Sequence, residues 1–188
     1  MLRDGFERLS PESRYRRFFS HVDRLSDEDL AYLTEVDGLN HTAWIAVLPD
    51  DAEHPGAGVG RWIRLPDEPQ VAEGAVTVVD ELQNLGIGTT LLRLTARSAV
   101  EAGIRAVRVY VQGENHPALK ILREVGIRPT SWESGITRID VPLPDDPDDL
   151  ADTPSPIVLR AAATGEIEAT STPAGGIRLI SEGAPDRT

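Results

Sequence analysis

A glycine-rich segment between a predicted strand and a predicted helix is the part of the sequence best suited to binding chemistry. The residues from Gln83 to Gly88 read Gln-Asn-Leu-Gly-Ile-Gly, and two glycines one residue apart let a backbone turn tightly and approach a ligand. The helix predicted to begin near Thr89 presents unpaired amide N–H groups and the positive end of its dipole at this turn. The combination favours pyrophosphate binding, while a turn without a ligand remains the alternative for the glycine pattern alone.

Two common nucleotide-binding loops do not match these residues. A P-loop requires Gly-Lys-Ser/Thr, but Gly88 is followed by Thr89 and Thr90. A dinucleotide-binding fingerprint requires a third glycine three residues after Gly88, where this sequence has Leu91. The sequence therefore disfavours sites for ATP and NAD.

The elements that must position this loop alternate between helical and strand patterns. Ser10-Pro11 and Ser26-Asp27 have the capping and first-turn residues of two short helices. Apolar residues at helical spacing predict two later helices, over residues 89–102 and 115–125. Alternating or β-branched stretches predict strands over residues 42–48, 59–65, 71–79, 105–111, 128–132 and 136–143.

Charge and length limit the classes of partner. The chain has 188 residues, of which 40% are hydrophobic, and a formal net charge of −12. This length fits one domain with some additional chain. An acidic surface repels phosphate backbones and attracts cations, so we expect no nucleic-acid partner and a positively charged acceptor.

Other site classes are disfavoured by what the sequence lacks. It contains no Cys and only four scattered His, which disfavours disulfides, thiolate chemistry and metal sites. No apolar run approaches the roughly 20 residues needed to span a bilayer, and the first residues do not resemble a signal peptide. The expectation is a cytoplasmic protein without a metal or a membrane partner.

Composition changes near the end of the last predicted hairpin. We expect a domain over residues 1–143, an acidic, proline-rich and solvated linker over residues 144–156, and a tail over residues 157–188. Within the tail, residues 157–160 and 177–180 have the pattern of short strands.

Two motifs together carry a resemblance to a known family. The stretch from Val76 through the Gln83–Gly88 loop resembles the acetyl-CoA-binding motif of the GCN5-related N-acetyltransferases (GNAT), Gln/Arg-x-x-Gly-x-Gly/Ala. Residues 114–127 resemble the last helix of that family, Asn-x-x-Ala followed by Gly-Phe, and the order of elements from Ser10 to Leu143 is also similar. The resemblance implies an α+β fold with three α/β/α layers, in which helices flank a mixed, mostly antiparallel twisted sheet.

The resemblance also implies a cosubstrate and the residues that bind it. Acetyl-CoA would donate an acetyl group to a primary amine, either a protein lysine or a small molecule. Backbone groups at two valines would pair with the pantetheine arm, and the loop would bind the pyrophosphate. The implied binding residues are Val76, Val78, Gln83, Asn84, Leu85, Gly86, Ile87, Gly88, Thr89, Thr90 and Asn115.

A narrower likeness indicates a catalytic carboxylate. Residues 9–19 and 71–78 resemble the catalytic domain of bacterial protein lysine acetyltransferases, which implies a general base at Glu73. Only a neutral amine attacks a thioester, and deprotonating a lysine-like amine at neutral pH costs about 4.6 kcal/mol. We expect burial to raise the pKa of Glu73 toward the working range, although a solvent-facing strand residue is the alternative.

Departures from the family pattern keep other functions open. Asn84 and Leu85 stand where the family often has Gly and Arg, and Leu122 stands where many relatives have a Tyr acid. These changes support a second hypothesis, in which the protein is a catalytically weak module that binds acyl-CoA or has a regulatory role. A purely structural or dimerising protein is the third hypothesis.

The chain also lacks the strand that usually precedes the first helix of the family. Residues 157–161 resemble such a strand. We hypothesise that the tail supplies it, either by folding back or by exchange with a second copy in a homodimer.

Three arginines near the first predicted helix have two interpretations. Arg14, Arg16 and Arg17 could meet a phosphate of CoA, but we expect them on the solvated face of the helix. Asp37 and His41, which precede the first predicted strand, are predicted to line the acceptor entrance.

Overall fold

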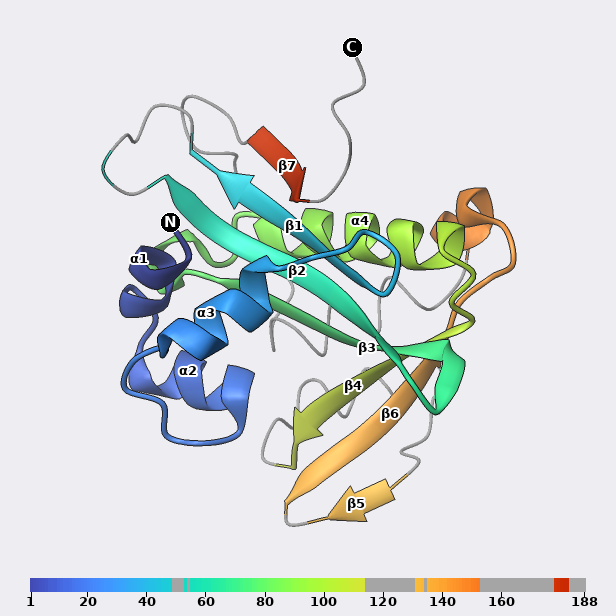
Figure 1. The fold of residues 1–188 in the computed structure, drawn as a ribbon, viewed down its shortest axis with the longest axis horizontal. Coiled ribbons are helices and arrows are strands. Elements are labelled where there is room, and N and C mark those ends of the chain that lie inside the picture. Colours follow the sequence, from blue (N-terminus) through green and yellow to red (C-terminus); the bar gives the residue numbers. More distant parts are fainter. Residues whose placement is uncertain (49–52, 54, 114–130, 134, 153–177, 183–188) are drawn as a thin grey trace.

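The computed structural model describes residues 1–48, 53, 55–113, 131–133, 135–152 and 178–182. Its strands are β1 (His41–Val47), β2 (Gly56–Leu65), β3 (Glu68–Val78), β4 (Ala106–Gln112), β5 (Ser131–Glu133), β6 (Ile136–Pro142) and β7 (Arg178–Glu182). They form one sheet with the order β5-β6-β4-β3-β2-β1-β7 (Figure 1). Among the described strands, β3 and β4 are the one pair that runs parallel, so the sheet is mixed and mostly antiparallel.

Helices cover both faces of this sheet. They are α1 (Leu2–Glu7), α2 (Pro11–Phe18), α3 (Asp27–Thr34) and α4 (Ile87–Glu101), with 3-10 turns η1 (Asp80–Leu82) and η2 (Pro147–Asp152). Successive strand residues point to opposite faces. On β2, Trp62 donates to Ser98 Oγ of α4 at 3.0 Å, while Arg61 donates to the carbonyl of Leu33 of α3 at 2.9 Å. The predicted three-layer α+β fold is therefore confirmed, with α4 on one face and α1–α3 on the other.

The two short helices begin where the sequence predicts. Ser10 caps α2 by accepting a hydrogen bond from the Ser13 amide at 3.2 Å. Ser26 and Asp29 form a reciprocal capping box at α3. These caps satisfy amides that have no partner within the helix.

The N-terminal helix α1 was not predicted. It spans six residues, contains Gly5 and has no side-chain cap, so its local signal is weak. Its Phe6 is nevertheless buried with Leu9, Leu25 and Leu33. Tertiary packing, rather than intrinsic propensity, stabilises a helix this short.

Two further segments differ from the sequence-based expectation. Helix α4 begins at Ile87 rather than near Thr89. Within the predicted solvated linker, residues 147–152 form η2, and Leu150 is buried in the core that α4 covers. The predicted helix over residues 115–125 lies outside the described residues. None of the described helices is long and apolar enough to cross a membrane.

A strand from the tail pairs with the edge of the sheet. Strand β7 runs antiparallel to β1, with Ala43 opposite Glu182 and Val47 opposite Arg178. The hypothesised segment, residues 157–161, lies outside the described residues. The edge strand therefore comes from residues 178–182 of the same chain, and the proposed division of the chain at Leu143 remains a prediction.

Close contact between α4 and β2 requires a glycine, which gives a stability prediction. A Cβ at Gly60 would lie 2.6 Å from Thr95 Oγ1 and 3.2 Å from Leu91 Cβ, whereas a Cβ at Gly5 would meet no atom of the described residues within 4 Å. We expect Gly60→Ala to lower the free energy of unfolding by about 1–3 kcal/mol through overpacking. Gly5→Ala should raise it by roughly 0.5–1 kcal/mol, because alanine favours a helix interior. Chemical denaturation of both variants tests this, and equal effects of the two would contradict the packing described here.

Candidate active site

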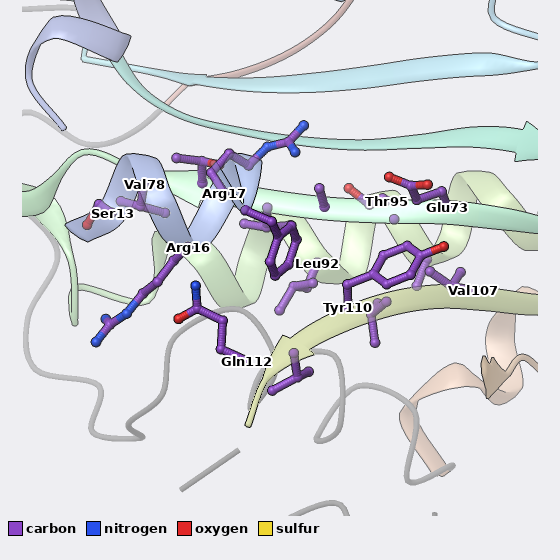
Figure 2. A pocket seen from close by; sticks show the side chains of 18 of the residues that line it. Ser13, Arg16, Arg17, Glu73, Val78, Leu92, Thr95, Val107, Tyr110 and Gln112 are labelled. Atoms are coloured by element: carbon purple, nitrogen blue, oxygen red, sulfur yellow. The ribbon is translucent and has the colours of Figure 1, made fainter. Parts of the chain in front are cut away.

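Strands β3 and β4 separate after a short parallel pairing. They pair only from Val71–Ala106 to Glu73–Arg108, although β3 continues to Val78 and β4 to Gln112. Beyond these pairs a cavity opens between the strands and extends to α2 and α4 (Figure 2). Its lining includes Ser13, Arg16, Arg17, Phe19, Glu73, Val76, Thr77, Val78, Gln83, Thr95, Tyr110 and Gln112.

The unpaired edge of β3 presents backbone polar groups to this cavity. The carbonyl of Gln70 accepts from Arg105 beside β4 at 2.7 Å, whereas the amide of Val79 donates to Ala57 beside β2 at 3.0 Å. Backbone groups alternate in direction along a strand, so those of Gly74 and Val76 point toward β4. Among the described residues no strand pairs with them there, which leaves them available to an extended ligand.

The loop after β3 has the geometry of an anion site. Gly86 adopts a φ of 83° and forms the N-cap of α4, and no described side chain caps this helix. Only glycine adopts that backbone conformation at little cost. The first amides of α4 are therefore free of side-chain competition and lie at the positive end of its dipole.

The side chains of this loop have mainly structural roles. Ile87 and Gly88 are buried, and half-buried Leu85 packs against the cluster that contains Ile87 and Leu91. Leu85 thus contributes to the core at the position where the family often has an arginine. Asn84, with a φ of 62°, is exposed together with Gln83 and Thr90.

Asp80 connects this loop to helix α2. Its carboxylate accepts hydrogen bonds from the Ser10 amide, the Ser13 hydroxyl and, at 2.8 Å, Gln83 Nε2. Gln83 Nε2 also donates to the carbonyl of Val78 at 3.1 Å, so both Gln83 and Val78 are engaged locally. Partial burial alone would raise the pKa of Asp80, but these hydrogen bonds outweigh burial and hold the pKa below its ordinary value.

The predicted base lies at the point where the strands separate. Glu73 lines the cavity but is exposed, so the expected burial of its carboxylate is not found. It lies opposite Ile63 on β2, on the face that α1–α3 cover. Figure 2 shows it near Tyr110 of β4, which is 37% exposed and contacts Phe19 edge to face.

The three arginines of α2 differ in their surroundings. Arg16 is exposed and pairs with Glu12 at 2.6 Å, and Arg14 donates to the carbonyls of Glu7 and Asp23. Arg17 is half-buried and lines the cavity. Burial lowers the pKa of Arg17, and the charge of Glu73 opposes that shift. The expectation of a solvated face is therefore wrong for Arg17.

Asp37 and His41 do not line either described cavity. Asp37 accepts from the amides of Leu39, Asn40 and His41, which lowers its pKa. His41 is buried, with its Nε2 3.1 Å from Arg61 Nη1. Burial, and secondarily the charge of Arg61, lower the pKa of His41. Both residues organise the entry to β1 rather than the cavity.

The structure brings together residues that the sequence did not single out. Thr95 of α4 and Gln112 of β4 line the cavity, and their Oγ1 and Nε2 atoms are buried and have no hydrogen-bond partner among the residues that the structure describes. In the sequence, only the helical periodicity around Thr95 and the alternation before Gln112 indicated which face each residue occupies. The predicted binding residue Asn115 lies outside the described residues. Within the described part of the chain, no group of acidic, His or Cys side chains could hold a metal.

Comparisons with known proteins agree with this geometry. A family model described as the acetyltransferase (GNAT) family matches residues 4–127. Acetyltransferase Pat of Mycolicibacterium smegmatis is 33% identical over 144 residues, and the match covers 76% of this chain. An acetyltransferase of Pseudomonas aeruginosa is 32% identical over 103 residues, which is 55% of this chain.

A solved structure extends the likeness to the fold. The crystal structure of the GNAT domain of S. lividans PAT has a TM-score of 0.65 and 29% sequence identity, and the match covers 76% of this chain and 83% of that one.

The two curated relatives are longer than the region that they share with this chain. The chain spans 42% of the M. smegmatis protein and 55% of the P. aeruginosa protein.

The bonds of Asp80 lead to a stability prediction. In Asp80→Asn, one carboxylate oxygen becomes an NH₂ group that cannot accept, so the Ser10 amide or the Ser13 hydroxyl loses its partner. We expect the free energy of unfolding to fall by about 1–3 kcal/mol. Glu81→Gln is the matched control, because its exposed ion pair with Arg8 should contribute less than about 1 kcal/mol. If Asp80→Asn lowers the free energy of unfolding no more than Glu81→Gln does, the connection between the loop and α2 does not contribute to stability.

The environment of His41 predicts a pH dependence. Its pKa is lower in the folded protein than its ordinary value of 6.5, so protonation favours the unfolded chain. The contribution of His41 is fully present above the ordinary pKa and is lost as the pH falls through that value toward the folded pKa. Between ~pH 7.5 and ~pH 5.5, the free energy of unfolding should therefore fall less in His41→Gln than in the wild type. His21→Gln, at an exposed position, is the control, and parallel pH profiles for wild type and His41→Gln would contradict the prediction.

Proposed function

Because this chain belongs to the acetyltransferase (GNAT) family, we propose that it transfers an acetyl group from acetyl-CoA to a primary amine. The observation that carries the proposal is the cavity between β3 and β4. It is bordered by a strand edge that no other described strand pairs with and by the loop that leads into α4, and the carboxylate of Glu73 lies where the strand pairing ends. These three features supply binding for the two parts of the cosubstrate and a proton acceptor for the amine.

Backbone groups of the chain would hold the cosubstrate. The free N–H and C=O groups of Gly74 and Val76 suit the amides of an extended pantetheine arm, in the manner of strand addition. The first amides of α4, from Ile87 to Thr90, suit the pyrophosphate. Gln83 and Val78 would act indirectly, because their side-chain amide and carbonyl bond to each other and shape the loop.

Glu73 would act as the general base. When acetyl-CoA is bound, it supplies the thioester that is attacked. The acceptor nitrogen would form the new N–C bond as the C–S bond breaks, and CoA would leave as its thiolate with the electron pair of that bond. Glu73 would take the proton that the nitrogen releases, directly or through a water. An exposed position at the cavity lets Glu73 meet an incoming amine without rearrangement.

A weakly catalytic acyl-CoA-binding module is the second candidate. Leu85 favours it, because packing into the core removes the charge-assisted phosphate contact that an arginine would make. Titration with acetyl-CoA and a thiol-release assay with amines separate the two functions. Binding without turnover supports the module, and an absence of binding at millimolar concentration rejects both.

The role of Glu73 gives a kinetic prediction. Glu73→Gln should lower kcat/KM for amine acetylation by about 100-fold or more, the usual contribution of a general base. Acetyl-CoA affinity by calorimetry and the unfolding midpoint should not change, because Glu73 is exposed and has no hydrogen-bond partner to lose among the described residues. Glu101→Gln on α4, whose partner is Arg97, is the control and should retain wild-type kinetics. Full activity of Glu73→Gln would remove this residue from the mechanism.

A further inference from the structure

Arg17 is a half-buried charge shared by two cavities. Its side chain lines the cavity between β3 and β4 and also a second cavity under α1–α3. Among the described residues it forms no hydrogen bond or ion pair. Its guanidinium carbon lies 5.0 Å from the ring centroid of Phe18. Partial burial of a charged guanidinium without a hydrogen-bond acceptor costs free energy. This position therefore suits the binding of an anion.

Neighbouring arginines differ from Arg17 in that their guanidinium groups have hydrogen-bond or ion-pair partners. Arg16 is paired with Glu12, and Arg14 bonds to two backbone carbonyls. In Figure 2, Arg16 and Arg17 leave α2 in opposite directions, and Arg17 extends over the sheet on the side of Glu73. Arg61 also lines the second cavity, but it is bonded to the carbonyl of Leu33 and to His41. Arg17 is therefore the residue best placed to meet an external anion.

Glu73 and Arg17 carry opposite charges that interact without forming an ion pair. The charge of Glu73 acts on Arg17, but the two side chains make no contact within salt-bridge distance. A ligand with an ammonium group and a carboxylate complements this arrangement, since its ammonium can face Glu73 and its carboxylate can face Arg17. A guanidinium binds a carboxylate through two parallel hydrogen bonds.

The second cavity provides room for an apolar group beside Arg17. It has a volume of about 220 Å³ and lies between α1–α3 and the strands β1–β3. Its walls are mainly apolar and include Leu9, Phe18, Leu33, Ile45 and Val59. For comparison, an apolar cavity of about 150 Å³ can hold a benzene ring. The cavity therefore fits the hydrocarbon side chain of a small molecule.

We propose that the acceptor is a small apolar amine that carries a carboxylate, as an apolar α-amino acid does, and that Arg17 binds this carboxylate. The apolar side chain enters the cavity under α1–α3, and the amino group lies toward Glu73. This inference rests on the proposed function for the fate of the amine, but the binding of the carboxylate does not depend on turnover.

Matched acceptors test the proposal with the full chain. L-Leucine is compared with 3-methylbutylamine, which lacks only the carboxylate, with leucine methyl ester, and with a lysine peptide. Thiol release gives kcat/KM, and calorimetry in the presence of CoA gives the affinity for leucine. The expected result is that leucine exceeds both 3-methylbutylamine and the ester by about 10-fold or more in kcat/KM, as charge-assisted hydrogen bonds predict.

Three variants assign the preference to Arg17. Arg17→Met should lower kcat/KM for leucine to the value for 3-methylbutylamine, so that the preference for the carboxylate is lost. Arg17→Lys, which keeps the charge but not the paired donors, should retain part of it, and it replaces Arg17→Met if that variant does not fold. Arg24→Met, at an exposed position that lines neither cavity, is the control and should retain the full preference.

The outcomes separate this inference from the proposed function. A preference that persists in both Arg17 variants, or a lysine peptide acetylated better than leucine, overturns the inference and leaves the acetyltransferase function intact. Leucine binding that depends on Arg17 but gives no acetylation supports the inference and rejects the function. Absence of both leucine binding and leucine turnover overturns the inference.

Discussion

The separation of β3 from β4 is the constraint on which the rest of the site depends. Two parallel strands that paired along their full length would satisfy each other's backbone groups and leave no space between them. Here pairing ends at Glu73 and Arg108, and β3 continues with one edge bonded to β2 and the other unpaired within the described part of the chain. The separation of the two strands creates the cavity and exposes polar backbone groups. It also places the carboxylate of Glu73 at the end of the cavity where the pairing stops.

An ionic cluster lies at the point where pairing ends. Arg108 is buried and donates to Asp140 of β6 through Nε at 2.8 Å and to Glu68 of β3 through Nη1 at 2.7 Å. These bonds raise the pKa of Arg108 further above its ordinary value. The guanidinium of Arg108 therefore connects β3, β4 and β6 at the point where β3 and β4 separate. Arg108 belongs both to the last parallel pair, with Glu73, and to an antiparallel pair, with Asp140. A second connection, through Asp80, fixes the opposite end of the cavity by joining the loop after β3 to α2.

Much of the fold could be predicted because its signals are local. Capping residues at Ser10 and Ser26, alternation in the strands and the glycine at position 86 each act within a few residues. Prediction failed where the deciding contacts are distant in sequence. Helix α1 depends on the burial of Phe6 against Leu33 and its neighbours, and the burial of Leu150 depends on α4. Neither contact leaves a periodic pattern in its own segment.

The same difference explains which site residues could be foreseen. The loop from Gln83 to Gly88 is a contiguous motif, so its place at the start of α4 followed from the sequence. The sequence does not show that Gln83 bonds to Val78, or that Leu85 belongs to the core, because both facts require the folded loop. Arg17 illustrates the limit most clearly. It resembles Arg14 and Arg16 in sequence, and only the packing of α2 against β3 makes it different.

Alternation along β3 would let one strand bind both of the proposed substrates. Side chains at Glu73, Ala75 and Thr77 lie on the face that α1–α3 cover, while backbone groups at Gly74 and Val76 point sideways into the cavity. Because these directions are perpendicular in any strand, a cosubstrate that pairs with the backbone does not compete with an acceptor that approaches the side chains. In the proposed reaction the two would meet at Glu73, where the opening between the strands begins and the face is exposed. The position of the proposed base is therefore a consequence of where β3 leaves β4.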